Sequence, residues 1–418
     1  MRSVLSGRAR PLAPNAITTV REQMITAGVE LTDLTDTNPT RHHLFDSRIS
    51  EVVSRHALQA NRYEPTPRGP WPARAALADR FGGDPQDYWL TASTSEAYGW
   101  LFALLSDPGQ AVAIPSPGYP LLEPLARWQS IRTMSYRTLY AHPSGWELDR
   151  DDLERVVSDP ATTAVVAVNP NNPTGAYVEN SLVEVASAAE LPIIADEVFF
   201  SYALPSSSTS LGSSALPNPA NDRGGSRQPT THQRIAGTTT TLTFGLDGLS
   251  KLLAAPQLKL GWIRLSGPQA ETKVAARALD QIADSYLSVN APVALALPEL
   301  LGLADDCVAM VTRRLTTNLA TAQQSFGDYR IRTTHGGWMM LLDVPPIMDP
   351  DALVIALMSR AALSVHPGYF YDLPDTTLAI SLLPEPGVFE ESCRRLSAAL
   401  TVLADEVTAS AGAAGGTV

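Results

Sequence analysis

Three short segments in the middle of the chain carry residue types that suit covalent chemistry on a small molecule. Residues 168–175 read VNPNNPTG, which predicts a strand end followed by a tight turn that offers asparagine amides to a ligand. Residues 193–198 read IIADEV, an apolar strand that ends abruptly in two carboxylates. Residues 248–251 read GLSK and place Lys251 among small and apolar residues after another predicted strand. An amide, a carboxylate and an amine therefore follow three strands in succession.

Each segment alone has an ordinary structural explanation. Turns rich in Asn, Pro and Gly are common, an acid at a strand end often caps a helix, and most lysines lie on the surface. Their order in one chain favours a functional interpretation instead. Asp196 at the strand end can pair with a cationic ring nitrogen of a cofactor and keep that nitrogen protonated, so that the ring accepts electron density. Lys251, with a pKa lowered by apolar surroundings, can serve as a Schiff-base amine.

The composition excludes several other classes of protein. The chain has 418 residues, 44% hydrophobic and 18% charged, which is typical of a globular protein long enough for two or three domains. The net charge of -12 without any basic run argues against nucleic acid or an anionic membrane as partner. Cys307 and Cys393 form no CxxC pair or His/Cys cluster, so we expect no metal site, no disulfide framework and a cytoplasmic location. No apolar run is long enough to span a membrane.

Short apolar runs alternate with helical patterns through the middle of the chain. The predicted strands are 110–114, 163–168 and 191–195, and the predicted helices are 71–81, 181–190 and 271–283. Such alternation predicts an α/β fold with a mostly parallel sheet that is covered by helices on both faces. Ligands of these sheets bind beyond the carboxyl ends of the strands, where the three chemical segments are expected.

The pattern changes near residue 300, which suggests two domains. We predict a large domain over 46–300 and a smaller α/β domain made of 1–45 and 301–418. The Ser/Thr/Pro/Gly-rich stretch 205–237 is predicted to be a flexible insertion in the large domain. The small residues at 409–418 predict a disordered C-terminal tail.

The three segments resemble those of the class I and II aminotransferases, pyridoxal phosphate (PLP) enzymes of fold type I, over nearly the whole chain. The resemblance implies a large domain with a mostly parallel central sheet and a smaller α/β domain. It assigns Asn172 to the cofactor's ring oxygen and Asp196 to its pyridine nitrogen. Lys251 is implied to hold the cofactor as a Schiff base and to move the proton at Cα.

The resemblance extends to three further motifs, which read NRY at 61–63, TASTSEA at 91–97 and PSPGYP at 115–120. The implied cofactor contacts are Thr94 and Ser95 at the phosphate, Ser250 next to the lysine, Lys259 at the phosphate, Tyr119 stacked on the ring and Tyr63 reaching the phosphate of a neighbouring subunit. Lys259 stands where the family more often has Arg and holds phosphate only as a point charge. A shared site implies a homodimer.

Two departures from the family pattern concern the cofactor. The family often has a tyrosine three residues after the strand-end Asp, and this chain has Phe199 there. Loss of that hydroxyl is expected to raise the pKa of the Schiff base unless another group, such as Tyr202, replaces it. Gly248 stands where the family often has a phosphate-binding Ser, so one phosphate contact is expected to be missing.

A third departure concerns the substrate. The family usually has an Arg that clamps the substrate α-carboxylate where this chain has Ala379. Arg41, in a loop with Asn38 that resembles the family's substrate entrance, is the first candidate replacement, although a solvated surface arginine is an equally good explanation. His366 and Tyr369 are further candidates for lining the site.

The resemblance implies an aminotransferase that moves an amino group between an amino acid and a 2-oxo acid by a ping-pong mechanism. The absent Arg leaves other PLP chemistry open, including a C–S β-lyase, a decarboxylase or a biosynthetic PLP enzyme. A catalytically silent, PLP-binding regulatory protein is a further alternative. The retained Lys251, the acidic charge and the lack of an N-terminal helix-turn-helix pattern argue against that alternative.

Overall fold

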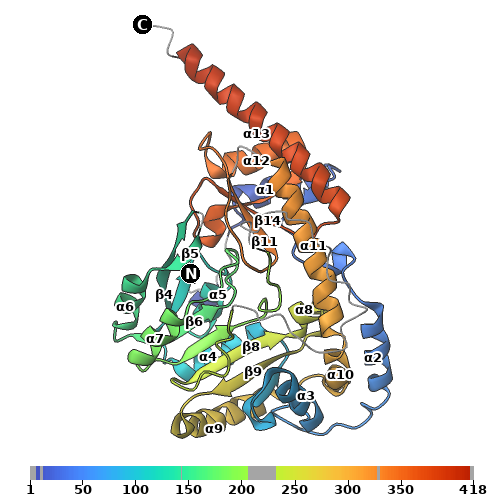
Figure 1. Cartoon of the computed structure of the whole chain (residues 1–418), viewed down its shortest axis with the longest axis vertical. Coiled ribbons are helices and arrows are strands. Elements are labelled where there is room, and N and C mark those ends of the chain that lie inside the picture. The colour runs from blue at the N-terminus through green and yellow to red at the C-terminus, as the bar shows by residue number, and fades with distance from the viewer. Residues whose placement is uncertain (1–5, 10–12, 143, 206–231, 327–329, 415–418) are drawn as a thin grey trace.

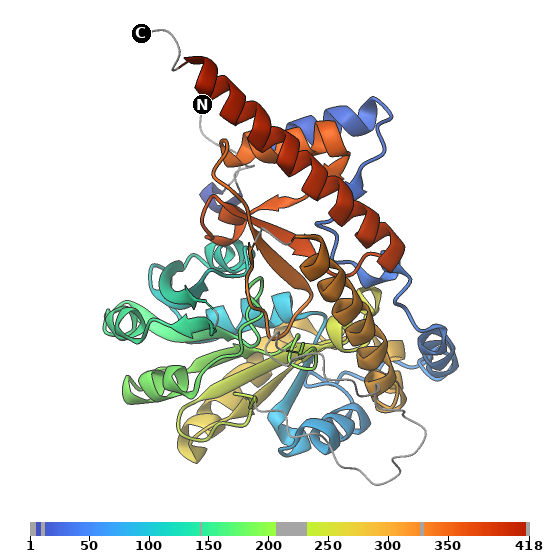
Figure 2. The ribbon, with the colours of Figure 1, turned by 45° about the horizontal axis from the view of Figure 1, so that its top comes forward.

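The computed structural model describes residues 6–9, 13–142, 144–205, 232–326 and 330–414. They form a broad α/β unit around a large sheet and a narrower unit above it in Figure 1. The long C-terminal helix runs across the narrower unit and projects beyond it, as Figure 2 also shows. Nowhere in these ranges is there a helix with the length and apolarity needed to cross a membrane.

Among the described residues, the large sheet has eight strands in the order β2-β9-β8-β7-β6-β3-β4-β5. The strands are β2 (Tyr88–Thr91), β3 (Ala111–Ser116), β4 (Arg132–Ala141), β5 (Gly145–Leu148), β6 (Thr162–Val168), β7 (Ile193–Asp196), β8 (Thr243–Gly248) and β9 (Gly261–Ser266). The pairs from β4 to β8 are parallel, and β5, β9 and β2 are added antiparallel at the edges. The central strands are short apolar runs because helices cover both of their faces.

Helices cover the two faces of the sheet through separate hydrophobic clusters. One face packs against α4 (Thr94–Leu105), α5 (Leu122–Trp128) and α9 (Gln269–Tyr286), and the other against α6 (Arg150–Val157) and α7 (Asn180–Ala188). A third cluster joins α2 (Ser47–Ala57), α3 (Trp71–Phe81), α8 (Leu249–Leu252) and α10 (Ala291–Leu301) to β2 and β9. The short helices η3 (Pro85–Asp87) and η4 (Pro256–Leu258) precede β2 and β9.

The narrower unit has its own antiparallel sheet, with the order β10-β11-β14-β13 in the described residues. Its strands are β10 (Arg330–Ile331), β11 (Met339–Asp343), β13 (His366–Pro367) and β14 (Thr377–Ser381), with β1 (Thr32–Asp33) paired to β12 (Leu363–Ser364) nearby. Its helices are α1 (Ala16–Thr26), α11 (Ala304–Ser325), α12 (Pro350–Ala361) and α13 (Pro386–Ala414), with η2 (Pro39–His42) and η5 (Gly368–Tyr371). One hydrophobic cluster joins these elements.

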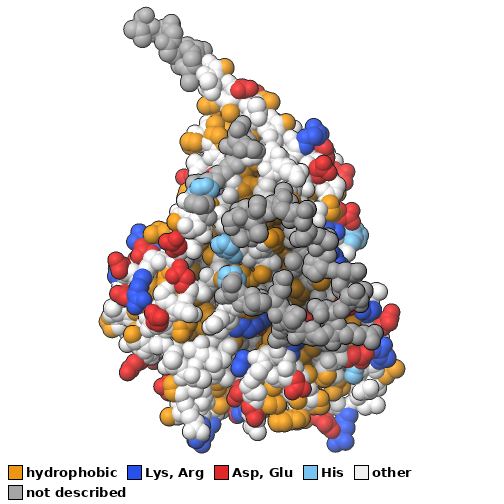
Figure 3. Space-filling model, in the orientation of Figure 1, with side chains coloured by type: hydrophobic (Ala, Val, Ile, Leu, Met, Phe, Trp, Pro, Cys, Tyr) orange, Lys and Arg blue, Asp and Glu red, His pale blue; other side chains and the backbone are white. Residues whose placement is uncertain are grey.

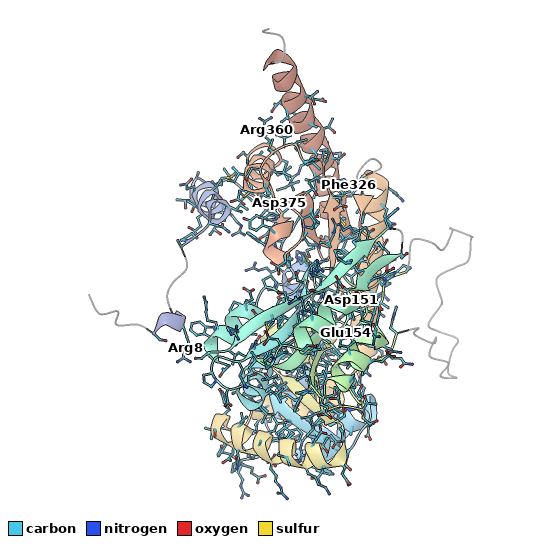
Figure 4. The ribbon with its side chains drawn as sticks, turned by 90° about the vertical axis from the view of Figure 1, so that its left-hand side faces the viewer. Arg8, Asp151, Glu154, Phe326, Arg360 and Asp375 are labelled. Atoms are coloured by element: carbon cyan, nitrogen blue, oxygen red, sulfur yellow. The ribbon has the colours of Figure 1, made fainter. Side chains whose placement is uncertain are left out.

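The two units are not divided as cleanly as a boundary near residues 45 and 300 suggests. Phe199, Tyr202 and Leu204, which follow β7 of the large sheet, pack into the core of the narrower unit. In the opposite direction, Arg8 on η1 (Gly7–Ala9) donates a hydrogen bond to the carbonyl of Trp128 at 3.0 Å, and Figure 4 shows it beside the large unit. The division into two domains stays a prediction, but the segment after β7 clearly joins them.

Several local predictions agree with the structure and others do not. The helix at 71–81 and the strand at 163–168 are found as α3 and β6. The tail at 409–418 was expected to be disordered, yet α13 remains helical to Ala414, because this run is rich in alanine, the best helix former. Residues 415–418 lie outside the described residues. Most of the predicted insertion, 206–231, does so too.

Charged side chains are spread over the visible face of the molecule. Among the described residues that Figure 3 shows on this face, acidic and basic side chains are interspersed.

Candidate active site

A cavity of about 280 Å³ lies where the carboxyl ends of the central strands meet the narrower unit. Its described lining consists of Thr37, Ser93, Thr94, Ser95, Tyr119, Val168, Asn172, Asp196, Val198, Phe199, Gly248, Ser250, Lys251, Pro256, Lys259, Leu260, Trp338 and Met339. We call Thr94, Ser95, Ser250 and Lys259 the cradle half of this cavity, and Phe199, Trp338 and Met339 its aromatic half. The cavity sits at the strand edge where the sequence predicted the chemistry.

Lys251 enters the cavity from α8, directly after β8. Its Nζ lies 4.7 Å from the ring centroid of Trp338 and 5.3 Å from that of Phe199. Burial against these rings lowers the pKa of Lys251 to about 8, while the nearby charge of Asp196 acts in the opposite direction. With a pKa of about 8, about a fifth of this amine is neutral near physiological pH, far more than of an ordinary lysine, so a nucleophilic or basic form is available although most of Lys251 is still a cation.

Asp196 is the last residue of β7 and is almost fully buried. The Tyr98 hydroxyl donates to its Oδ2 at 3.0 Å and the Val198 N–H donates to its Oδ1 at 3.2 Å. Burial raises the pKa of Asp196 to about 6, and these two hydrogen bonds limit the rise. The carboxylate is therefore mostly ionised at neutral pH, fixed in orientation and able to pair with a cation.

The cradle half contains the N-terminus of α4. Ser93 caps this helix by accepting the Glu96 N–H, so the amides of Thr94 and Ser95 have no acceptor within the helix and can bind an anion. A Cβ at position 261 would lie 3.2 Å from the Thr94 nitrogen, and Gly261 leaves this space open.

The glycine at position 248 has a structural explanation. Gly248 and Gly261 face each other across β8 and β9. A Cβ on Gly248 would lie only 3.1 Å from both the Gly261 Cα and the Leu260 carbonyl oxygen. The close approach of the two strands, rather than the phosphate, therefore decides the residue at this position. Ser250 and Lys259 remain as polar groups in the same half of the cavity.

The asparagine turn and the tyrosine loop support each other. The buried Asn171 donates from Nδ2 to the Pro117 carbonyl at 3.2 Å and accepts from the Thr174 hydroxyl at 3.1 Å. These bonds connect the turn after β6 to the loop after β3, and they place Asn172 and Tyr119 in one cavity wall. Burial raises the pKa of Tyr119 to about 12, so its ring enters the cavity as a neutral aromatic group.

The structure brings together eight of the predicted site residues and leaves five outside the lining. Those inside are Thr94, Ser95, Tyr119, Asn172, Asp196, Ser250, Lys251 and Lys259, and those outside are Asn38, Tyr63, Arg41, His366 and Tyr369. Trp338, Met339, Val198 and Thr37 line the cavity and were not predicted. Trp338 and Met339 come from the narrower unit, some 90 positions after Lys251, and no motif in the sequence marks them.

Each predicted residue outside the lining has another partner or faces solvent. The side chain of Arg41 is 72% exposed and pairs with Asp36 at 3.4 Å, while the Asn38 side chain caps η2. The Tyr369 hydroxyl donates to Asp351 at 2.5 Å. Tyr63 is 69% exposed, so it contributes nothing to the cavity of its own chain.

The position of the absent arginine lies on one face of the small sheet. Ala379 of β14 lies between Leu341 of β11 and His366 of β13. Arg332, directly after β10, donates its backbone N–H to the Leu341 carbonyl at 2.9 Å. Ala379 is buried in an apolar cluster that also includes Met339 of the aromatic half. A longer side chain at position 379 would therefore extend from an apolar cluster that lies beside the cavity.

Neither polar neighbour of Ala379 provides a free cation. Arg332 is bound to Asp343 at 2.8 Å and lies over the ring of Trp146 at 5.3 Å. His366 shares a hydrogen bond of 2.9 Å with the Tyr371 hydroxyl, and burial lowers its pKa, which favours the neutral ring. Among the described lining residues, the cations are Lys251 and Lys259.

Tyr202 does not supply the hydroxyl that is absent at Phe199. The Tyr202 hydroxyl donates to the backbone carbonyl of Lys251 at 2.6 Å, and its ring packs edge-on against Trp338 at 5.2 Å. It therefore supports the backbone of Lys251 from behind, while Phe199 presents only its ring to the cavity.

The family model of class I and II aminotransferases matches residues 39–396. The chain belongs to this family. The family implies PLP as cofactor, and the match includes every residue of the cavity lining except Thr37.

The sequence of this chain is moderately similar to those of several curated relatives. S-alkyl-thiohydroximate lyase SUR1 of Arabidopsis thaliana is 30% identical over 259 residues, which are 59% of this chain and 50% of the relative. Glutamate-pyruvate aminotransferase AlaA of Haemophilus influenzae is 28% identical over 246 residues, 56% of this chain and 54% of the relative. The chain thus spans about half the length of the curated relatives it matches.

Solved structures agree with the fold over almost the whole chain. An aminotransferase from Escherichia coli superimposes with a TM-score of 0.80 at 22% identity, covering 95% of this chain and 98% of the other. Alanine aminotransferase from Pyrococcus furiosus gives a TM-score of 0.79 at 21% identity, covering 95% and 100%. The fold is therefore that of the fold-type-I aminotransferases, as predicted.

Proposed function

We propose that the protein is a PLP-dependent aminotransferase that moves an amino group between an amino acid and a 2-oxo acid. The observation that carries this proposal is the meeting of Lys251 and Asp196 in one cavity that has an anion cradle beside them. The amine with a lowered pKa suits the aldehyde of PLP, the buried carboxylate suits its ring nitrogen, and the hydrogen-bond donors of the cradle half suit its phosphate.

The chemistry of the donor set supports this cofactor. The Thr94 and Ser95 amides and the Lys259 ammonium would hold the phosphate, Asp196 the ring nitrogen, Asn172 the ring oxygen and Tyr119 one face of the ring, while Lys251 would provide the covalent attachment. When bound, PLP supplies a ring that delocalises the electron pair left at Cα of the substrate.

The chain's own residues would then position the substrate and move its protons. The amine of Lys251 would take the proton from Cα of the substrate and later give a proton back. The carboxylate of Asp196 would hold the proton at the ring nitrogen. Phe199 and Trp338 exclude water from the reacting atoms. In a ping-pong cycle the amino donor and the 2-oxo acid use this cavity in turn.

The proposal includes a cytoplasmic homodimer with shared active sites. Tyr63 faces solvent in a single chain and is available to the phosphate of a neighbouring copy. Tyr286 and Leu287 are also more than half exposed, and apolar side chains of this size are typical of an interface. The dimer would complete the cradle half with a hydroxyl that one chain does not supply.

The absorbance spectrum of the purified protein with PLP tests this function. We expect a visible band that a particular amino acid bleaches, with release of one 2-oxo acid per site, and a 2-oxo acid should restore it. Continuous release of ammonia from a single substrate would instead indicate a lyase. A band unchanged by every α-amino acid would contradict amino acids as substrates, and the absence of any band would contradict the cofactor.

A further inference from the structure

A buried group of charges lies directly behind Asp196 and has no part in the reaction proposed above. Glu197 and Asp247 follow Asp196 and Leu246, which are paired across β7 and β8. Their side chains are only 1% and 6% exposed. Arg234 lies between them, with its Nη1 at 3.2 Å from Glu197 Oε2 and 3.2 Å from Asp247 Oδ2. We call Arg234, Glu197 and Asp247 the rear charge group.

The carboxylates of Asp196 and Glu197 point to opposite faces of the sheet. Asp196 accepts the Tyr98 hydroxyl from α4 on one face. Glu197 accepts the Ile235 N–H at 2.6 Å and the Asn169 amide at 3.2 Å on the other face. The side chains of successive residues in an extended chain point to alternate faces of the sheet. The two carboxylates are therefore neighbours in the chain but have different hydrogen-bond donors.

The position of Arg234 is fixed by aromatic rings. Its guanidinium lies 5.1 Å from the ring centroid of Phe81 and 4.5 Å from that of Phe200. It is shared by two carboxylates, which leaves the rear charge group with one negative charge when both are ionised. Charges interact strongly where water is excluded. Glu197 directly follows Asp196 in the chain, so this negative charge changes the electrostatic potential at the Asp196 carboxylate and raises its pKa.

The titration of Asp196 responds to this charge. Burial is the main cause of its raised pKa, and the charge of Glu197 raises it further. The groups that face Asp196 on the cavity side are Tyr98, Tyr119 and Lys251, and among them Lys251 is a cation in the free protein. Once Lys251 is bound to the cofactor, the rear charge group is the main fixed charge near Asp196 among the described residues.

We propose that the rear charge group positions a proton on the ring nitrogen of the cofactor, with Glu197 supplying the negative potential and Arg234 keeping Glu197 ionised. This inference rests on the proposed function, because it concerns the same ring nitrogen. Asp196 touches that nitrogen, whereas Glu197 acts only through Asp196 and is a positioning residue.

A pair of cofactor probes tests the role of Glu197. PLP has the ring nitrogen, and its carbocyclic analogue has C–H in the same place. Glu197→Gln removes the charge but keeps the side-chain shape. We expect the apparent Kd for PLP to rise about tenfold and that for the analogue to change less than about twofold. The ¹⁵N chemical shift of labelled PLP in the variant should indicate loss of the ring proton at lower pH than in the wild type.

Two further variants provide controls. Glu184→Gln removes a negative charge from α7 on the same side of the molecule, at a side chain that is 66% exposed, and should change neither Kd nor the ¹⁵N shift. Asp247→Asn removes the other carboxylate of the rear charge group. It should act in the same direction above pH 7, since burial raises the pKa of Asp247 to about 7. It replaces the first variant if Glu197→Gln does not fold.

The outcomes separate this inference from the proposed function. If the wild type binds PLP with a protonated ring nitrogen and Glu197→Gln does so equally well, only the inference fails. If the variant loses PLP and the analogue equally, Glu197 has a purely structural role and the inference also fails. If the wild type does not distinguish PLP from the analogue and shows no protonated ring nitrogen, the proposed function itself fails.

Discussion

The two halves of the cavity differ in origin and in chemistry. The cradle half comes from the large unit, and its groups are hydroxyls, helix amides and a lysine placed at the ends of consecutive elements. The aromatic half combines Phe199, from the turn after β7, with Trp338 and Met339 from the narrower unit. The first half resembles the family pattern except at Lys259, where the family more often has Arg, while the second has Phe199 in place of the family's tyrosine and lies beside Ala379, where the family usually has an arginine. From this comparison we expect the cradle half to affect mainly the binding of the cofactor and the aromatic half mainly the choice of substrate.

The largest expected effect comes from Lys251, whose amine lies against the rings of the aromatic half. Lys251→Ala should abolish covalent attachment of PLP and reduce kcat by about 10⁴-fold or more, because both the nucleophile and the base are lost. Mass spectrometry after borohydride reduction measures the attachment. Lys259→Ala is the matched control: it removes a lysine of the cradle half and should weaken PLP binding while leaving covalent attachment intact. A reducible adduct in Lys251→Ala would overturn the assignment.

Asp196 is expected to have the next largest effect, visible even without cofactor. Its pKa is raised from 3.8 to about 6 by burial, so the folded state holds the proton more tightly than the unfolded state. This stabilises the fold below pH 4, and the contribution is lost as pH rises through 6. Relative to Asp196→Asn, the wild type should lose about 3 kcal/mol of unfolding free energy over this interval.

Denaturant unfolding at a series of pH values measures this difference. Asp375→Asn, an exposed carboxylate of the narrower unit marked in Figure 4, serves as control and should give a much smaller change. A constant difference between wild type and Asp196→Asn from pH 4 to pH 7 would show that burial does not shift this carboxyl group.

Substitutions of Ala379 test how the cavity binds the carboxylate of a substrate. Ala379→Arg places a guanidinium beside Met339, where the described lining has no arginine, and should lower the Kd of carboxylate ligands about tenfold. Ligand-induced change of the visible band of the PLP-loaded protein measures the Kd. Ala379→Met gives a side chain of similar length without charge. Equal effects of Arg and Met would show that bulk, and not charge, governs this position.

The smallest expected effect concerns Phe199. Phe199→Tyr adds a hydroxyl in the aromatic half, where the ring already lies 5.3 Å from Lys251 Nζ. A hydrogen bond to the ring oxygen should move the pH midpoint of the visible band downward by about one pH unit or less. Tyr202→Phe is the comparison, because its hydroxyl binds the Lys251 carbonyl and should affect stability rather than the midpoint. A midpoint unchanged in Phe199→Tyr would indicate that the ring oxygen is out of reach.

Several residues of the cavity lining that come from the large unit could be predicted because they stand in short motifs. Asn172, Asp196 and Lys251 lie at or shortly after the ends of β6, β7 and β8, and parallel strands bring their carboxyl ends to one edge. No motif in the sequence could show whether Arg41 replaces the arginine that is absent at Ala379. Arg41 lies in the expected loop, yet its side chain faces solvent and pairs with Asp36.

The sequence by itself determined the fold class, the order in which the three chemical segments occur at the ends of the central strands, and the chemistry of the cradle half. These depend on local patterns: strand periodicity, turn residues and a helix N-terminus. Only the tertiary structure decided the aromatic half and the rear charge group. Trp338 reaches Lys251 because the segment after β7 enters the core of the narrower unit, and Glu197 meets Arg234 and Asp247 because β7 and β8 are adjacent. Contacts between residues so far apart in the chain arise from packing, which leaves no periodic trace in the sequence.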